Sequence, residues 1–256
     1  MKSLGLPQSV RACLFDLDGV ITKTAVVHAA AWKEMFDDFL RGRGGEDGSG
    51  GADEDLRPFS DGDYDTYVDG LPRADGVRSF LASRGIELPE GSPDDPPGRE
   101  SVQGLGNRKN DLLLEKIHKE GVEAYPGSIR YVNAVREAGL RTAVVSSSKN
   151  CRDILVSVGI EGLFDVRIDG LVAAERGLPG KPAPDTFLAA ARDLGTDAAA
   201  SAVFEDALAG MDAGRAGHFG YVVGVDRVGQ AGELRRHGAD VVVTDLADLT
   251  DSEEHA

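Results

Sequence analysis

The sequence predicts an α/β protein: a core with a doubly wound, Rossmann-like parallel sheet and, inserted into it, a helical cap domain. From residue 125 onward, apolar β-rich runs alternate with helical patterns, which is typical of a parallel sheet with helices on both faces. An earlier apolar run at residues 10–15 is separated from that half by a stretch of helices and loops. We therefore assign residues 1–26 and 123–256 to the core and residues 27–122 to the cap.

Composition limits the classes of partner. The chain has 256 residues, 41% of them hydrophobic and 28% charged, as expected of a soluble globular protein. Its formal charge of −16 argues against nucleic acid and anionic membranes, because both attract clustered positive charge. No signal peptide or membrane-spanning run is visible, and Cys13 and Cys151 show no metal or disulfide spacing. We expect a cytoplasmic monomer.

The first apolar run ends in two carboxylates and a glycine, Asp16, Asp18 and Gly19. Residues two apart on a strand point the same way, so Asp16 and Asp18 project together at its carboxyl end. Ligands bind at the carboxyl ends of strands in open α/β sheets. An ordinary Asp-Gly turn is the alternative interpretation.

The inserted stretch begins with an amphipathic helix predicted over residues 22–40. Residues 42–63 and 89–100 are rich in Gly, Pro, Ser and acidic residues, so we expect loops there, partly disordered.

Two places in the insertion carry cations suited to an anionic ligand. Arg73 lies in a glycine-punctuated turn, residues 67–77, and its planar paired donors suit phosphate, although a solvated arginine is the alternative. Arg108 and Lys109 lie near the start of a helix predicted over residues 104–120, where cations oppose the helix dipole.

Polar residues also follow strands in the second half. The strands are predicted over residues 141–145, 164–168, 202–204, 221–225 and 240–243. Ser146 opens a Ser-Ser-Ser-Lys-Asn turn that feeds a helix and suits an anion, with helix capping as the alternative. After a loop, Lys181 lies on a proline-constrained segment before a helix over residues 186–194, where it can act as a point charge toward phosphate. Glu205 and Asp206 end a further strand.

These strand and loop ends can share one edge of a doubly wound sheet. Oxygen ligands from Asp16, Asp206 and, as a further candidate, Glu205 suit Mg²⁺, which also binds substrate phosphate. Asp16 can attack phosphorus as a nucleophile, and Asp18 can protonate the leaving oxygen and deprotonate the attacking one. The competing interpretation is a set of unrelated turns and helix caps.

The set Asp16-x-Asp18-Gly19, Ser146, Lys181 and Glu205-Asp206 resembles the haloacid dehalogenase superfamily of phosphohydrolases and phosphotransferases. The resemblance covers the core at both ends of the chain, and the insertion matches the helical cap of that superfamily. A dehalogenase proper would not need the second aspartate, so Asp18 favours phosphoryl transfer.

Within the superfamily the chain is most similar to the beta-phosphoglucomutase family. The matching stretches are residues 15–22 with Thr24, His28 and Trp32, then residues 70–73, 108–110, 146–150 and 180–185. The resemblance implies catalytic roles for Asp16, Asp18, Ser146, Lys181 and His28. It implies substrate binding by Thr24, Trp32, Gly70, Leu71, Arg73, Lys109, Ser147, Ser148, Lys149 and Asn150. It implies Mg²⁺ ligation by Asp16, the backbone carbonyl of Asp18, Glu205 and Asp206.

That family interconverts beta-glucose 1-phosphate and glucose 6-phosphate through a bisphosphate and a phospho-aspartyl enzyme, which is the activity that the resemblance implies here. Arg73 would then hold the distal phosphate of the bisphosphate, Lys109 would reach the substrate from the cap, and His28 would assist Asp18. A sugar-phosphate phosphatase, in which water replaces the sugar acceptor, is the alternative enzyme. A noncatalytic sugar-phosphate sensor is the alternative of another class, although a pure binder needs no nucleophile and acid pair.

Overall fold

The computed structural model describes residues 4–44 and 54–250, and within them the chain forms two compact units. One unit comprises the chain up to Thr24 and from Val122 onward, and the other comprises Ala25–Gly121. Across the described residues, no helix combines the length and the apolar character required to cross a membrane.

The first unit, which we call the core, is built on a parallel six-stranded sheet. Its strands are β1 (Ala12–Phe15), β2 (Arg141–Val145), β3 (Val166–Ile168), β4 (Ser201–Glu205), β5 (Tyr221–Val225) and β6 (Val241–Val243). The strand order β3-β2-β1-β4-β5-β6 reverses direction at β1, as in doubly wound folds, and confirms the predicted fold class.

The register of the central strands aligns their carboxyl ends. Phe15 of β1 lies opposite Val144 of β2 and Phe204 of β4. The next residue along each strand is therefore at the same level, which places Asp16 between the ends of β2 and β4. Strand pairing alone therefore brings together the strand ends at which the sequence analysis predicts the site.

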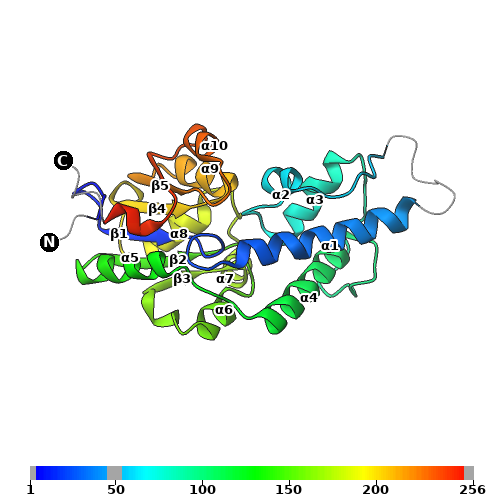
Figure 1. The fold of residues 1–256 in the computed structure, drawn as a ribbon, viewed down its shortest axis with the longest axis horizontal. Coiled ribbons are helices and arrows are strands. Elements are labelled where there is room, and N and C mark those ends of the chain that lie inside the picture. The colour runs from blue at the N-terminus through cyan, green and yellow to red at the C-terminus, as the bar shows by residue number, and fades with distance from the viewer. Residues whose placement is uncertain (1–3, 45–53, 251–256) are drawn as a thin grey trace. The chain divides into compact units, whose positions relative to one another are not determined.

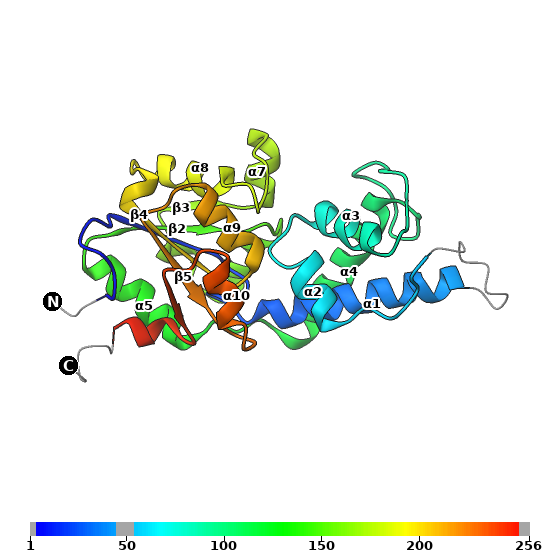
Figure 2. The ribbon, with the colours of Figure 1, turned by 90° about the horizontal axis from the view of Figure 1, so that it is seen from above.

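Helices cover both faces of this sheet (Figure 1). They are α5 (Pro126–Glu137), α6 (Cys151–Ser157), α7 (Gly170–Arg176), α8 (Asp185–Asp193), α9 (Leu208–Ala216) and α10 (Ala231–Arg236). Alternation along β1 assigns its side chains to two layers, because Leu14 packs in one cluster with Phe187 of α8 while Phe15 contacts Tyr131 of α5 edge to face. Figure 2 shows α5 and α8 on opposite sides of the sheet.

The second unit, which we call the insertion, is helical within its described residues. Its helices are α1 (Thr24–Gly44), α2 (Asp61–Tyr67), α3 (Arg73–Ser83) and α4 (Val102–Glu120). Aromatic rings fill its centre: Phe36 of α1 stacks on Trp32 and Phe59 with ring centroids 5.3 Å apart in each pair, and lies 4.1 Å from Phe80 of α3. This separate apolar cluster gives the insertion its own hydrophobic core.

The two chain connections to the insertion leave the core as a hydrogen-bonded pair. Thr22 and Ala124 form an antiparallel bridge, and the Lys23 amide donates to the Glu123 carbonyl at 2.8 Å. The Lys23 ammonium also lies 2.6 Å from the Glu123 carboxylate. The outgoing and returning segments are therefore fixed side by side.

Helix boundaries correct four predictions. The predicted loop 42–63 overlaps the end of α1 and the start of α2, where Ser60 and Asp63 form a capping box; residues 45–53 lie outside the described residues. Helix α7 occupies part of a segment expected to be a loop, because the Asp169 side chain caps its first amides and Gly177 ends it in a left-handed conformation.

The other two corrections concern the cations of the insertion. Arg73 is the first residue of α3 and does not lie in the preceding turn. Helix α4 begins at Val102, capped by the Ser101 hydroxyl, so Arg108 and Lys109 lie in its second turn. The argument from the helix dipole therefore fails for both, because the dipole acts mainly within the first turn.

Candidate active site

Asp16 and Asp206 follow the ends of β1 and β4, and Gly19 lets the two acidic turns approach each other. Gly19 has a φ of +82°, and a Cβ atom built on it would lie 1.7 Å from Asp206 Oδ2. No side chain other than hydrogen fits there without moving Asp206. Glycine in the Asp-x-Asp-Gly turn is thus required by close packing against the second acidic turn.

Lys181 joins the ends of three strands. Its ammonium donates to Asp16 Oδ1, to Glu205 Oε1 at 2.7 Å and to the Val145 carbonyl at 3.4 Å. The side chain is 1% exposed. Burial alone lowers the pKa of Lys181, but the two carboxylates outweigh burial and hold the pKa above its usual value. Lys181 is therefore a fixed positive charge beside Asp16.

Glu205 is fully buried and orients Lys181. Its Oε1 accepts from Lys181, and its Oε2 accepts from the Asp206 and Ala207 amides at 2.8 and 3.3 Å. Gly210 makes room for this carboxylate, since a Cβ there would lie 1.6 Å from Glu205 Oε1. Both carboxylate oxygens thus already have donors.

The donor set fits a divalent cation. Oxygen atoms of Asp16, Glu205 and Asp206 lie within 4.8 Å of one another, and all three residues are buried. Burial raises the pKa of Asp16, and the neighbouring Glu205 carboxylate raises it further. Three carboxylates gathered around one ammonium leave an excess of negative charge, and carboxylate oxygens are the ligands that hard divalent cations prefer.

Asp18 is held by the turn that leads into the insertion. The Thr24 hydroxyl donates to Asp18 Oδ1, and the Thr22 and Thr24 hydroxyl oxygens lie 2.6 Å apart. The structure thus gives Thr24, predicted to bind substrate, a contact with the predicted acid and base.

The Ser146–Asn150 turn lies after β2, as predicted. Ser146 Oγ accepts from the Ser148 amide at 3.1 Å, and Ser148 Oγ accepts from the Asn150 amide at 3.2 Å. Such contacts are common in serine-rich turns. In each of them the hydroxyl oxygen accepts a hydrogen bond, so the hydroxyl proton can still be donated to an anion. Lys149 is exposed, and Ser147 packs against Gly170, where a Cβ would lie 2.7 Å from the Ser147 carbonyl oxygen.

In the insertion, the structure brings three predicted residues together. The ammonium of Lys109 lies 3.0 Å from His28 Nδ1 and 4.9 Å from the centroid of the Trp32 ring. A lysine ammonium can only donate, so Nδ1 of His28 is the unprotonated nitrogen of this pair. Lys109 is 3% exposed, and Trp32 packs within the apolar centre of the insertion.

Arg73 lies beside Asn107 of α4. Its Nη2 donates to Asn107 Oδ1 at 3.2 Å. Burial lowers the pKa of Arg73, and Asp111 partly offsets this. Gly70, with a φ of +71°, and Leu71 form the turn before α3. Among the described residues, no carboxylate lies within ion-pair distance of Arg73.

Two residues that the sequence interpretation missed support the acidic turns of the core. Arg227 donates to the Gly19 carbonyl at 2.7 Å and stacks on Tyr125, and Gln230 donates to the Asp206 carbonyl at 3.1 Å. Both lie in the loop after β5, where the Asp226 carboxylate accepts from several backbone amides. An aspartate directly after a predicted strand was the available signal, since this loop is on the same sheet edge.

Known proteins resemble this chain over nearly its whole length. The family model of haloacid dehalogenase-like hydrolases matches residues 10–218. A beta-phosphoglucomutase of Mycobacterium tuberculosis is 57% identical, covering 97% of this chain and 94% of that protein, and one of Bacillus subtilis is 31% identical, covering 94% and 92%. A solved beta-phosphoglucomutase from Clostridium difficile shares the fold, with 24% identity, a TM-score of 0.71 and coverage of 95% and 94%. The chain therefore belongs to the haloacid dehalogenase-like family and, within it, to the beta-phosphoglucomutase family.

Proposed function

We propose that this protein is a Mg²⁺-dependent beta-phosphoglucomutase that interconverts beta-glucose 1-phosphate and glucose 6-phosphate through a sugar bisphosphate. The observation that carries the proposal is the buried contact of Lys181 with Asp16 at the aligned ends of the central strands. The high identity to proteins of that name over nearly the full chain supports the choice of substrate.

In the proposed first step, a carboxylate oxygen of Asp16 attacks a phosphorus atom of the bisphosphate. A phosphorus–oxygen bond to Asp16 forms, the bond to the sugar oxygen breaks, and Asp18 gives its proton to that oxygen. The glucose 6-phosphate formed leaves, and beta-glucose 1-phosphate takes its place. In the return step, Asp18 takes the proton from the free hydroxyl of that sugar, whose oxygen accepts the phosphoryl group from Asp16 and forms the bisphosphate again. Lys181 keeps its positive charge beside the transferred group throughout.

We assign direct metal ligation to Asp16 and Asp206, with the backbone carbonyl of Asp18 as a further ligand. When bound, Mg²⁺ would neutralise charge on the transferred phosphoryl group. Glu205 remains a candidate ligand by position, but its two oxygens already accept from Lys181 and from two amides, which favours an orienting role.

A mutase must also bind the phosphate that is not being transferred. We assign this to Arg73, whose guanidinium has a neutral side-chain partner in Asn107. Lys109 would bind the sugar phosphate, and His28 would assist Asp18. Trp32, Gly70 and Leu71 would be the other substrate-binding residues of the insertion. Ser147, Ser148, Lys149 and Asn150 would bind the substrate from the core, and Ser146 would contact the transferred phosphoryl group. We further propose a monomer in the cytoplasm.

A sugar-phosphate phosphatase is the second candidate, because the matching family model describes hydrolases. Phosphorus NMR separates the two functions. The protein is incubated with Mg²⁺, beta-glucose 1-phosphate and a trace of the bisphosphate. Glucose 6-phosphate should appear, whereas release of inorganic phosphate alone would assign the phosphatase function. The same sample with Asp16→Asn is the control for contaminating activity.

A further inference from the structure

Among the residues that the structure describes, Asn107 is the one side chain hydrogen bonded to Arg73, and the contact uses its carbonyl oxygen. Its amide nitrogen donates to two carbonyls, of Pro93 at 3.0 Å and of Asp95 at 2.9 Å. Because an amide group presents its two donors on one side only, these two carbonyls fix its orientation. Asn107 Oδ1 must therefore face Arg73.

The two carbonyls belong to a segment of residues 89–101, which we call the α3–α4 loop. Asp95 is buried and accepts from the Ser101 hydroxyl at 2.6 Å, while Ser101 caps α4. Gly91 has a φ of +78°, and a Cβ there would lie 2.2 Å from Asp95 Oδ2. The loop is thus folded tightly onto the start of α4 although it has no regular secondary structure.

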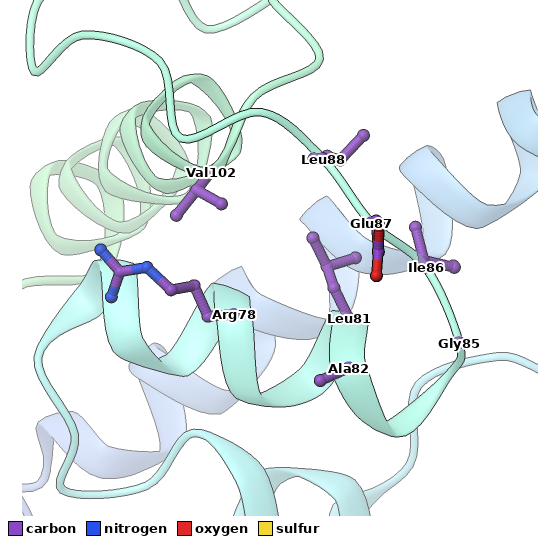
Figure 3. Close-up of a pocket in the computed structure, with 8 residues that line it drawn as sticks. All are labelled: Arg78, Leu81, Ala82, Gly85, Ile86, Glu87, Leu88 and Val102. Carbon is purple, nitrogen blue, oxygen red and sulfur yellow. The ribbon is translucent and has the colours of Figure 1, made fainter.

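Both ends of this loop are anchored to the neighbouring helices. Arg78 of α3 binds Glu90 at 2.6 Å, and the Val102 amide donates to the Pro89 carbonyl at 3.0 Å. A pocket of about 420 Å³ lies between these elements. Figure 3 shows the chain passing along it from Gly85 to Leu88, with Arg78 of α3 and Val102 among its lining residues. The pocket is lined by residues of α3, by residues 85–88 and by Val102, the first residue of α4.

We infer that Asn107, held by the α3–α4 loop, is the positioning residue for Arg73 and so determines how strongly the enzyme binds the non-transferred phosphate of its sugar phosphate. The inference rests on the proposed function of Arg73. The α3–α4 loop fixes the side-chain amide of Asn107, and this amide holds Nη2 of Arg73. The other N–H groups of the planar guanidinium then have an orientation that suits phosphate.

The chemistry of the amide matters as much as its position. A carboxylate at 107 would have nearly the same shape but would neutralise Arg73 and repel a phosphate. A neutral partner orients the guanidinium and leaves its positive charge for the ligand. Asparagine at this position is therefore matched to an anionic substrate.

The test compares N107A, N107D and R73A with wild type in steady-state kinetics on beta-glucose 1-phosphate and in thermal unfolding. We expect KM to rise about tenfold in N107A, the equivalent of about 1.4 kcal/mol, with kcat little changed. We expect a larger rise in N107D, although this variant keeps the shape of the side chain. Gln103→Ala is the matched control, because this amide on the same helix donates to Glu90 and, within the described part of the chain, is not hydrogen bonded to Arg73.

The outcomes separate the inference from the proposed function. A KM unchanged in R73A would overturn the phosphate role of Arg73 itself. A raised KM in R73A with N107D equal to wild type would overturn only the positioning role of Asn107. N107D also turns an acceptor toward the Pro93 and Asp95 carbonyls. A purely structural role therefore predicts that KM rises in both variants only in proportion to their loss of thermal stability, and that proportionality would also contradict the inference.

Discussion

The core and the insertion each contain a buried cation held by two carboxylates. In the core, Lys181 contacts Asp16 and Glu205 and is 1% exposed at its side chain. In the insertion, Arg84 contacts Asp63 at 2.8 Å and Asp55 at 3.2 Å and is 4% exposed. The two cations are alike in burial and in the number of carboxylates that they contact, yet only Lys181 lies at the carboxyl ends of a parallel sheet.

The surroundings of the two cations explain the difference in role. Arg84 also donates to the Arg57 carbonyl at 3.0 Å and stacks on Phe80, so its donors fasten a chain segment to the aromatic centre of the insertion. Lys181 also donates to a carbonyl, that of Val145, and lies 5.0 Å from the centroid of the Phe187 ring. It differs from Arg84 because its two carboxylate partners, Glu205 and the proposed nucleophile Asp16, lie at the ends of strands of the sheet. A buried ion pair is thus by itself no evidence of catalysis, and its position in the fold decides the role.

The largest contrast is expected when one carboxylate is removed from each cluster. Asp16→Asn should lower kcat by about 10⁵-fold, because an amide oxygen is a poor nucleophile toward phosphorus. Asp63→Asn should leave kcat within about twofold and lower thermal stability instead. Steady-state kinetics and circular dichroism on both variants check this. An active Asp16→Asn enzyme would refute the nucleophile assignment.

Removing the cations sharpens the comparison further. Lys181→Met and Arg84→Met should each lower the free energy of unfolding by about 3 kcal/mol, since each leaves two carboxylates without their shared partner. Only Lys181→Met should also lower kcat, by about 10³-fold. Urea unfolding and turnover are measured on the same preparations. If Arg84→Met folds but loses kcat to the same extent, the Arg84 cluster does not act on stability alone, and the contrast between the two clusters fails.

A smaller effect is expected from Gly19→Ala, with Gly139→Ala as its control. Both glycines have nearly the same positive φ, +82° and +80°, but a Cβ at Gly139 meets no atom within 4 Å. Gly139→Ala should therefore lower the free energy of unfolding by about 1 kcal/mol from backbone strain alone. Gly19→Ala should add a loss of about tenfold in Mg²⁺ affinity, measured by calorimetry, because it displaces Asp206. Equal Mg²⁺ affinity in both variants would contradict the role of Asp206.

The smallest expected effect is a dependence of stability on pH. Burial raises the pKa of Asp63, but hydrogen bonds from Ser60 and the nearby Arg84 outweigh it and hold the pKa below its usual value. The stability that Asp63 contributes is therefore complete above its unfolded pKa of about 4 and is lost as the pH falls through the lower folded value. Melting temperatures between pH 6 and pH 3 should fall less steeply in Asp63→Asn than in wild type. Parallel curves would exclude this contribution.

The sequence predicts the core better than the insertion, for a physical reason. Strand runs such as residues 141–145 and 221–225 match their observed bounds, and parallel pairing then brings Asp16, Lys181 and Glu205 to one edge. In a helical insertion there is no strand pairing from which the positions of residues on different helices could be predicted. The α2 helix of the insertion was missed because its start depends on a side-chain cap, by Ser60, within a polar segment. In the core, α7 was missed for the same reason, since Asp169 caps it.

Local sequence pattern does not identify the supporting residues themselves, although Asp226 after a predicted strand pointed to the loop that carries one of them, Arg227. Arg84, Asn107 and Arg227 act through partners that are 21, 34 and 208 positions away in sequence. Each looks like an ordinary surface polar residue in its own window. Only the folded chain shows that Arg227 supports the turn of Asp18 and that Asn107 faces Arg73.

The paired connections at Thr22 and Ala124 have a consequence for how the chain can vary. The insertion connects two segments that are already hydrogen bonded to each other inside the core, in the way that a hairpin loop connects two paired strands. Its length and sequence can change without altering the strand order or the register that aligns Asp16 with its neighbours. The piece of chain proposed to bind the non-transferred phosphate is therefore exchangeable, while the proposed phosphoryl-transfer residues of the core stay in place.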